Sequence, residues 1–214
     1  CQLFVDYGTE DQKEKYLKPL AIGEKLGAYS LSEPQSGSDA SNMRTFAKKE
    51  GDHYVINGTK NWVTNGISSD IVALFCVTEK GAGYKGISAF AVEKGTLGLS
   101  TGKKENKLGI RASDTCELYF ENCRIPDENI IGEEGQGFKV AMKALGGGRI
   151  GIAAQALGLA RAALDASISY AKERKQFGKT IGEFDAIRNK LANMATEIDA
   201  ARMLVWRAAK LKDD

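Results

Sequence analysis

Two loop-like stretches of the sequence combine hydroxyl groups and glycine with one large aromatic residue each: YSLSEPQSGSD at residues 29–39 and KNWVTNG at residues 60–66. Neither stretch contains a histidine, a cysteine or an acid pair of the usual catalytic kind. Hydroxyls, backbone N–H groups and an aromatic plate suit a flat polar heterocycle, which a protein holds by hydrogen bonds at its edge and stacking on its face. A flavin is such a molecule, and it carries its own redox chemistry, so the protein needs no conspicuous nucleophile or metal.

A third stretch, the glycine run GGGRIG at residues 146–151, precedes a helical pattern. It follows no strand and lacks a parallel βαβ context, which disfavours a dinucleotide-binding fold of the Rossmann type. Three consecutive glycines also weaken a helix, so we expect the helix to start near them. Its free N–H groups, with Arg149 at that end, favour contact with a phosphate or an adenine.

The composition is that of a globular protein: 214 residues, 43% hydrophobic and 27% charged, with a net charge of +2. This length allows one or two domains with a substantial core. The near-neutral charge and the lack of a groove-reading motif argue against nucleic acid as a partner. No apolar run approaches the roughly 20 residues of a membrane span, and the start CQLFVDYG lacks the design of a signal peptide. We therefore expect a soluble intracellular protein that binds neither nucleic acid nor membrane.

Metal chemistry is also disfavoured by the sequence. The four cysteines, Cys1, Cys76, Cys116 and Cys123, have no C-x-x-C spacing, and the single histidine, His53, cannot complete a zinc site. We expect buried or surface thiols and no metal.

Three regions differ in the period of their apolar residues. We assign residues 1–25 to the end of an N-terminal helical domain, because TEDQKEKYLKPLA at 9–21 reads as a short capped helix that ends near Pro19. In residues 26–125, short runs of alternating β-branched and aromatic residues are separated by Gly, Asn and Asp. With turns expected at Asn57-Gly58 and Asn65-Gly66, this region predicts an antiparallel β-barrel or sandwich.

Residues 126–214 carry a helical pattern and form the first part of a C-terminal helical domain. Two long helices are predicted by apolar residues at spacings of three and four, with RKQFGKTIG as the connection. The second helix keeps a seven-residue repeat, which is typical of a helix packed nearly antiparallel in a bundle. The fold class expected for the whole chain is therefore α+β with several domains. The residues that carry the two helical patterns are Ile150, Ala153, Leu157, Ala160, Leu164 and Ile168, then Phe184, Ile187, Leu191, Met194, Ile198, Ala201 and Val205.

Five stretches, in this order and spacing, closely resemble the acyl-CoA dehydrogenases, most of all their short-chain, butyryl-CoA branch: YSLSEPQSGSD, NGTKNWVTNG, KLGIRASDTCELYFENCRIPDENIIGEEGQGF, GRIGIAAQALGLARAALD and ERKQFGKTIGEFDAI. The resemblance covers essentially the whole chain. It implies a helical domain, a central β-domain and a C-terminal four-helix domain that together hold FAD, in a homotetramer built as a dimer of dimers. On this basis we expect the chain to be a fragment that contains the end of the first domain, the second, and about half of the third.

The resemblance also implies roles for individual residues at the flavin. Tyr29, Leu31 and Ser32 would line it, with the Ser32 hydroxyl at the pyrimidine edge. Trp62 would lie beside the isoalloxazine, and the Thr64 hydroxyl would bind N5, the atom that receives hydride. Taken alone, Trp62 reads as ordinary sheet core, and Ser32 with Glu33-Pro34 as a turn.

The remaining implied contacts involve coenzyme A and a neighbouring subunit. Ser38 would contact the CoA moiety near the pyrophosphate, and Arg149 would hold its adenosine end. Arg174, Gln176 and Phe177 would reach the FAD of a neighbouring subunit, although Arg174 taken alone reads as a solvated charge.

Two glycines depart from the family pattern. Gly146 stands where relatives usually carry an Asp that touches the CoA adenine. Gly148 stands where some branches carry the catalytic Glu, and the other position for that Glu lies beyond Asp214. The nearby acids Glu133, Glu134 and Glu173 read as solvated surface charges, so we expect residues 1–214 alone to be inactive.

The implied reaction is the α,β-dehydrogenation of a short-chain acyl-CoA to the trans-2-enoyl-CoA, with electrons passed to an electron-transfer flavoprotein. A carboxylate removes the α-proton while the flavin accepts the β-hydrogen as hydride. Such an enzyme is expected in the bacterial cytoplasm or the mitochondrial matrix. Three alternatives stay open: a flavin-dependent oxidase or monooxygenase on the same scaffold, a non-catalytic remnant of the family, and a β-plus-helical protein without flavin.

Overall fold

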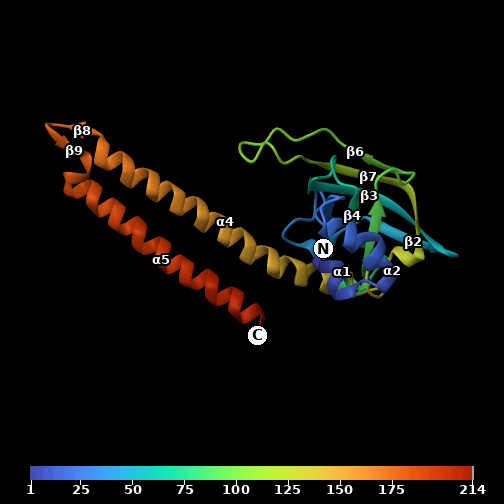
Figure 1. Cartoon of the computed structure of the whole chain (residues 1–214). Helices are drawn as coiled ribbons and strands as arrows, with labels where there is room; N and C mark the ends of the chain where they lie inside the picture. The colour runs from blue at the N-terminus through green and yellow to red at the C-terminus, as the bar shows by residue number, and fades with distance from the viewer. Residues whose placement is uncertain (214) are drawn as a thin grey trace. The chain divides into compact units, whose positions relative to one another are not determined.

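The computed structural model describes residues 1–213. The chain divides into two compact units, Cys1–Ala144 and Leu145–Asp214. The first unit contains a short helical segment and a curled β-sheet, and the second contains a pair of long helices (Figure 1).

The helical segment at the start of the first unit begins with α1 (Gln2–Tyr7) and continues through α2 (Glu10–Gln12), a π-helical turn (Lys13–Leu17) and α3 (Lys18–Ala21). The predicted cap is confirmed, because the Thr9 hydroxyl accepts a hydrogen bond from the Gln12 backbone N–H and the Gln12 side chain accepts one from the Thr9 N–H. The predicted end near Pro19 is too early. Pro19 lies in the first turn of α3, where a missing N–H costs little, and the helix continues to Ala21.

A seven-stranded mixed sheet forms the body of the first unit (Figure 1). Its order is β1-β4-β2-β3-β7-β6, with β5 paired to β4. Short 3₁₀ turns lie at Ala40–Asn42, Gly83–Gly86 and Asp127–Asn129. The strands are β1 (Gly27–Ser30), β2 (Phe46–Glu50), β3 (His53–Thr64), β4 (Ile71–Val77), β5 (Ile87–Glu93), β6 (Leu99–Thr101) and β7 (Thr115–Pro126).

Two strand pairings differ from the expected antiparallel sheet. Strands β1 and β2 each pair with β4 in parallel, whereas β2–β3, β3–β7, β4–β5 and β6–β7 are antiparallel. Alternating apolar residues indicate which face of a strand is buried, but they do not specify the direction of its partner. The fold class itself, a β-domain followed by long helices, is confirmed.

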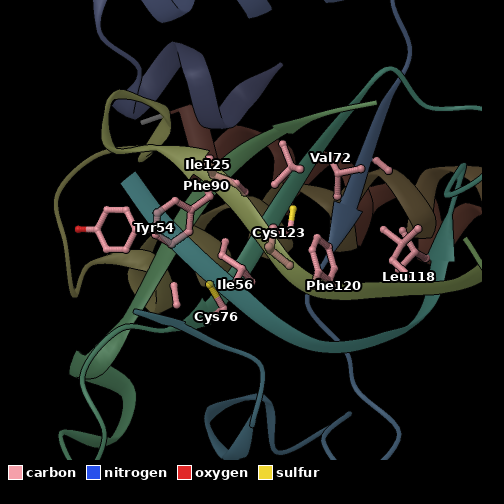
Figure 2. Packing of buried hydrophobic residues seen from close by; sticks show 14 of the residues in the cluster. Tyr54, Ile56, Val72, Cys76, Phe90, Leu118, Phe120, Cys123 and Ile125 are labelled. Atoms are coloured by element: carbon pink, nitrogen blue, oxygen red, sulfur yellow. The ribbon is translucent and has the colours of Figure 1, made fainter. Parts of the chain in front are cut away.

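The core of the first unit lies on one face of the curled sheet. Aromatic and β-branched side chains from β3, β4, β5 and β7 converge there, with the rings of Tyr54 and Phe90 4.9 Å apart (Figure 2). Strands β4 and β5 are buried at six of their seven positions, so both of their faces are covered. Three of the four cysteines are buried free thiols: Cys76, Cys116 and Cys123.

The two Asn-Gly pairs have different structures. Asn65-Gly66 forms the predicted turn directly after β3, with Asn65 at φ 61°. The prediction of a turn at Asn57-Gly58 is wrong, because both residues lie inside β3 at a bulge in its pairing with β7. Gly58 has φ 150° and packs directly against Thr45: a Cβ atom at this position would lie 2.4 Å from the Thr45 hydroxyl oxygen.

The second unit is built from α5 (Asp185–Asp213) and the part of α4 (Gly137–Glu173) that follows Ala144; the two long helices are those that the helical spacings predict. They are joined by the short hairpin β8 (Lys175–Gln176) and β9 (Lys179–Thr180) and a 3₁₀ turn at Ile181–Glu183. Facing residues of α4 and α5 line an open apolar groove of about 610 Å³. None of the helices within residues 1–213 is both long enough and apolar enough to cross a membrane.

The glycine run is not where α4 begins. The helix starts at Gly137, so Gly146, Gly147, Gly148 and Arg149 all lie in its interior. Each interior glycine costs about 1 kcal/mol relative to alanine, which a 37-residue helix can absorb. The predicted anion site at a helix N-terminus beside Arg149 is therefore wrong, because the N–H groups there are bonded within the helix.

Candidate functional site

The end of β3 presents Trp62 through a β-bulge. The pairing with β7 shifts register between Lys60 and Val63, and Trp62 takes φ 56°, which is rare for a bulky residue. The Trp62 backbone N–H donates to the Asn61 side-chain oxygen at 2.8 Å, which supports this conformation. Trp62 is 61% exposed, so it is not sheet core. Backbone strain of this kind gathers at functional sites, where it directs a side chain.

Thr64, two residues further on, is also exposed and is the last residue of β3. The turn that follows it is fixed by the buried residue Asp114. The backbone oxygen of Asp114 accepts from Asn65 N at 3.0 Å, and its carboxylate accepts from Ile67 N at 3.2 Å and from the Ser68 hydroxyl. Asp114 thus holds the segment that positions Thr64, a role that the sequence alone did not indicate.

The first hydroxyl-rich stretch lies directly beside this strand. The Asn61 N–H donates to the Ser32 backbone oxygen at 2.8 Å, so Ser32 is bonded to the residue that precedes Trp62. Leu31 is buried and Ser32 is half-buried. The structure therefore brings together Ser32, Trp62 and Thr64, which are separated by about thirty residues in the sequence.

Tyr29 and Ser38 lie at the two ends of the same stretch. The Tyr29 hydroxyl donates to the Ala141 backbone oxygen at 3.2 Å, and burial raises the pKa of this phenol. Tyr29 also packs on Phe75, with ring centroids 4.9 Å apart. Ser38 is exposed in the loop between β1 and β2, so its hydroxyl is accessible to a ligand.

A buried ion pair between Lys60 and Glu33 connects the two stretches. The Lys60 ammonium donates to Glu33 Oε1 and to the Leu31 backbone oxygen, both at 2.9 Å, and the two charged side chains are 0% and 2% exposed. Burial lowers the pKa of Lys60, and the Glu33 charge opposes that change. Burial also raises the pKa of Glu33, but the Lys60 charge and backbone N–H bonds outweigh it, so the pKa lies below its ordinary value.

Sequence reasoning treated Glu33 as part of a turn and gave Lys60 no role. A signal was present, however: Tyr54, Ile56 and Lys60 occupy the same parity of β3, and this parity faces the core. A lysine at a core-facing position of a strand requires a buried partner.

The predicted residues of the second unit all lie on its surface or within α4. Arg174 directly follows α4, and Gln176 and Phe177 belong to the hairpin after it. Phe177 has φ 52° and is 93% exposed. Gly146 and Arg149 lie on α4, where Arg149 is exposed.

Among the described residues, the three acids that the sequence singled out, Glu133, Glu134 and Glu173, are all exposed. Glu134 accepts a hydrogen bond from the Tyr54 hydroxyl, Glu133 accepts one from Gln136, and Glu173 ends α4 on the surface. No cluster of His, Cys, Asp or Glu within the described residues could hold a metal ion.

The arrangement fits a flat aromatic ligand. Trp62 supplies an exposed ring, Thr64 supplies an exposed hydroxyl on the same strand end, and Ser32 supplies a second hydroxyl beside them. A curled mixed sheet with this surface, followed by two long helices, is the architecture of a class of flavoprotein oxidoreductases.

Within that class, the chain belongs to the acyl-CoA dehydrogenase family. The description "Acyl-CoA dehydrogenase, middle domain" matches residues 28–123, and "Acyl-CoA dehydrogenase, C-terminal domain" matches residues 135–214. This confirms the resemblance drawn from the five sequence stretches.

Individual relatives support the short-chain branch. A protein of Clostridium acetobutylicum named "Acyl-CoA dehydrogenase, short-chain specific" is 55% identical over 212 residues, which are 99% of this chain and 56% of that protein. The structure of butyryl-CoA dehydrogenase from Megasphaera elsdenii superposes with a TM-score of 0.96 at 50% identity, covering 99% of this chain and 56% of that one.

A second solved structure has the same degree of similarity. It is described as the electron transferring flavoprotein of Acidaminococcus fermentans, in work towards a mechanism of flavin-based electron bifurcation. One of its chains matches with a TM-score of 0.96 at 51% identity, and the match covers 99% of this chain and 56% of that one. The chain thus spans about half the length of the relatives it matches.

Proposed function

We propose that the protein containing this chain is an FAD-dependent dehydrogenase that converts a short-chain acyl-CoA to the trans-2-enoyl-CoA. The observation that carries this proposal is the bond between Asn61 N and the Ser32 carbonyl, which assembles an aromatic plate and two hydroxyls from two separate stretches. The identity of 50–55% to proteins named short-chain specific or butyryl-CoA dehydrogenase supports the substrate class.

In this proposal, the residues of the first unit hold and orient the flavin. FAD, when bound, accepts the β-hydrogen of the substrate as hydride. Trp62 would lie beside the isoalloxazine, and the Thr64 hydroxyl would donate a hydrogen bond at the ring edge. Ser32 holds the polar end of the ring, while Leu31 and Tyr29 exclude water from it, which prevents side reactions.

The proposed substrate contacts follow from the resemblance to the family. Ser38 binds the pyrophosphate region of coenzyme A, and Arg149 binds its adenosine end next to Gly146. The base that removes the α-proton lies outside residues 1–214, because Gly148 has no carboxylate and the nearby acids are exposed or bonded elsewhere.

The assembly and the redox partner complete the proposal. Arg174, Gln176 and Phe177 contact the FAD of a neighbouring subunit in a homotetramer, in the cytoplasm of a bacterium or the matrix of a mitochondrion. Electrons pass on to an electron-transfer flavoprotein, and the similarity to a chain from a bifurcating flavoprotein system supports this partner.

The test replaces Thr64 by valine in a version of the protein extended to the length of its relatives. Losing a hydrogen bond made at the reacting ring should slow flavin reduction by butyryl-CoA about tenfold or more, with a smaller effect on FAD affinity. The matched control is Thr101→Val, an exposed strand threonine on β6, which should change neither quantity.

Three results would count against the proposal. A colourless protein would exclude the flavin. Equal losses of reduction rate and FAD affinity in Thr64→Val would place that hydroxyl in binding alone. Rapid reaction of the reduced protein with dioxygen would favour an oxidase or monooxygenase on the same scaffold.

A further inference from the structure

The buried ion pair of Lys60 and Glu33 takes one residue from each of the two stretches of the candidate site. Lys60 lies on β3, one residue before Asn61, and Glu33 follows Ser32 directly. Both side chains are almost completely buried. The pair itself offers no surface to a ligand, so its effect on the site must act through the residues on either side.

Within residues 1–213, the three acceptors of the Lys60 ammonium all belong to the segment 31–43. They are the Leu31 backbone oxygen, Glu33 Oε1 and the Met43 sulfur, at 2.9, 2.9 and 3.8 Å. One ammonium on β3 therefore holds both ends of the loop that carries the first stretch. An apolar residue of the same size would fill the space but would donate to none of these atoms.

Glu33 closes the same loop from within. Its carboxylate accepts from the backbone N–H groups of Arg44 at 2.6 Å and Thr45 at 3.0 Å, and its own backbone forms a two-bond bridge with Ser36. The carboxylate thus satisfies two backbone N–H groups at the start of the segment that leads into β2. Together the two charges join the loop, β3 and the entry to β2 at one buried point.

The bond between Asn61 N and the Ser32 carbonyl lies directly beside this point. It connects residues that neighbour Lys60 and Glu33 in the chain, and Trp62 follows on the same strand. A shift of the loop relative to β3 would therefore change the spacing between the Ser32 hydroxyl and the Trp62 ring.

A buried ion pair is seldom the most stable choice for a core. Removing both charges together is often neutral, because the cost of desolvating two ions is removed along with their attraction. Removing one charge alone leaves the other buried without a partner, which is strongly destabilising. Stability alone is thus a weak reason for a lysine and a glutamate here, whereas a fixed loop position is a specific one.

We propose that Lys60 and Glu33 are positioning residues, whose buried ion pair sets the distance between the Ser32 side and the Trp62–Thr64 side of the flavin site. This inference rests on the proposed function and adds to it a determinant of flavin geometry that touches neither flavin nor substrate.

The experiment uses the protein extended to the length of its relatives and three variants: Lys60→Met, Glu33→Gln and the double variant. Each is measured for its thermal unfolding midpoint, for the Kd of FAD with the apoprotein, and for amide hydrogen exchange of Asn61 in the apoprotein. The single variants should lose both stability and FAD affinity. The double variant decides the question, since it leaves no buried charge unpaired.

In the double variant, we expect the unfolding midpoint to recover most of the loss seen in the single variants. The Kd of FAD should stay at least tenfold weaker than in the wild type, and the Asn61 amide should exchange at least tenfold faster. The flavin absorption bands should also shift, because the ring edge meets its hydroxyls at a changed spacing.

The matched control is Asn129→Leu. Asn129 is a buried polar residue of the same unit that donates to the Ala91 backbone oxygen, so its loss should lower the midpoint. It should leave the Kd of FAD within about twofold of the wild type, since it lies on neither stretch. A Kd that follows the midpoint through all four variants would overturn the proposal.

Failure of the proposed function is distinguished from failure of this inference. If the wild-type protein binds no FAD, the proposed function is wrong, and the exchange of the Asn61 amide still decides whether the pair fixes the loop. If the wild type binds FAD and the double variant retains both wild-type affinity and wild-type exchange at Asn61, the positioning role is wrong while the function stands.

Discussion

Replacing Gly58 by alanine tests the close packing of β3 against the segment that enters β2. Gly58 lies at a bulge of β3 with φ 150°, a conformation that side-chain-bearing residues rarely adopt. A Cβ atom there would lie 2.4 Å from the Thr45 hydroxyl oxygen and 2.6 Å from its Cα. These distances are far below normal contact, and the Cα cannot rotate away, so the backbone of one strand must move.

The expected cost has two parts. Holding a non-glycine residue at this φ costs about 1–3 kcal/mol, and forcing an extra methyl group into a packed site costs a further 1–3 kcal/mol or so. Gly58→Ala should therefore reduce the free energy of unfolding of the first unit by about 4 kcal/mol. Gly51 provides the matched control, because it has φ 67° but no atom within 4 Å of its Cβ position. Gly51→Ala should cost only about 1–2 kcal/mol.

The assay is native-state hydrogen exchange of the β4 and β5 amides. These strands are buried at six of seven positions, so their amides exchange only when the sheet opens. A loss of about 4 kcal/mol corresponds to exchange roughly a thousandfold faster, and the control should show about a tenfold increase. Equal acceleration in the two variants would mean that the contact with Thr45 costs nothing, and the reasoning would be refuted.

Three further predictions follow from the same structure. The pKa of Glu33 is held below its ordinary value, so the stability that its charge contributes is complete above the unfolded-state pKa of about 4.3 and is lost as the pH falls through the folded-state pKa. Glu33→Gln should therefore flatten the acid side of a plot of unfolding midpoint against pH, and an unchanged slope would contradict this. Gly148→Ala should raise the free energy of unfolding of the second unit by about 0.5–1 kcal/mol, because the residue lies inside a helix and its new Cβ would meet no atom within 4 Å. Urea denaturation followed by Trp206 fluorescence measures this change, and a loss of stability would show that a further segment packs on Gly148. Arg174→Ala should weaken FAD retention and oligomer stability together, as seen by gel filtration with flavin detection, whereas a monomer that keeps FAD at nanomolar concentration would rule out a shared site.

Local patterns predicted the helices and the family well, because both depend on residues close together in sequence. The spacings of three and four residues located α4 and α5, and five motifs in order identified the family. The sequence predicts the start of α4 too late, because three glycines lower the local helix propensity although a 37-residue helix tolerates them.

Features that depend on distant partners were not predictable in the same way. The two Asn-Gly pairs look alike in sequence, yet one is a turn and the other a bulge, and the difference arises from the approach of Thr45 to Gly58. The parallel pairings of β4 and the ion pair of Lys60 with Glu33 likewise depend on contacts between separated segments. The proposed flavin roles of Trp62 and Ser32 came from the resemblance and stay predictions.

The long pairing of β3 with β7 also affects how the chain reaches its folded state. His53 pairs with Pro126 and Thr64 with Thr115, so one edge of the twelve-residue strand β3 has no partner until β7 has been synthesised, at least fifty residues later. At a synthesis rate of about 5–20 residues per second, this edge stays open on the ribosome for several seconds. The hairpin of β2 and β3 can form at once, and until β7 emerges its free edge is a surface for intermolecular strand pairing. A nascent chain arrested shortly before Thr115 should therefore recruit chaperones or aggregate, and one extended past Pro126 by the length of the exit tunnel should not.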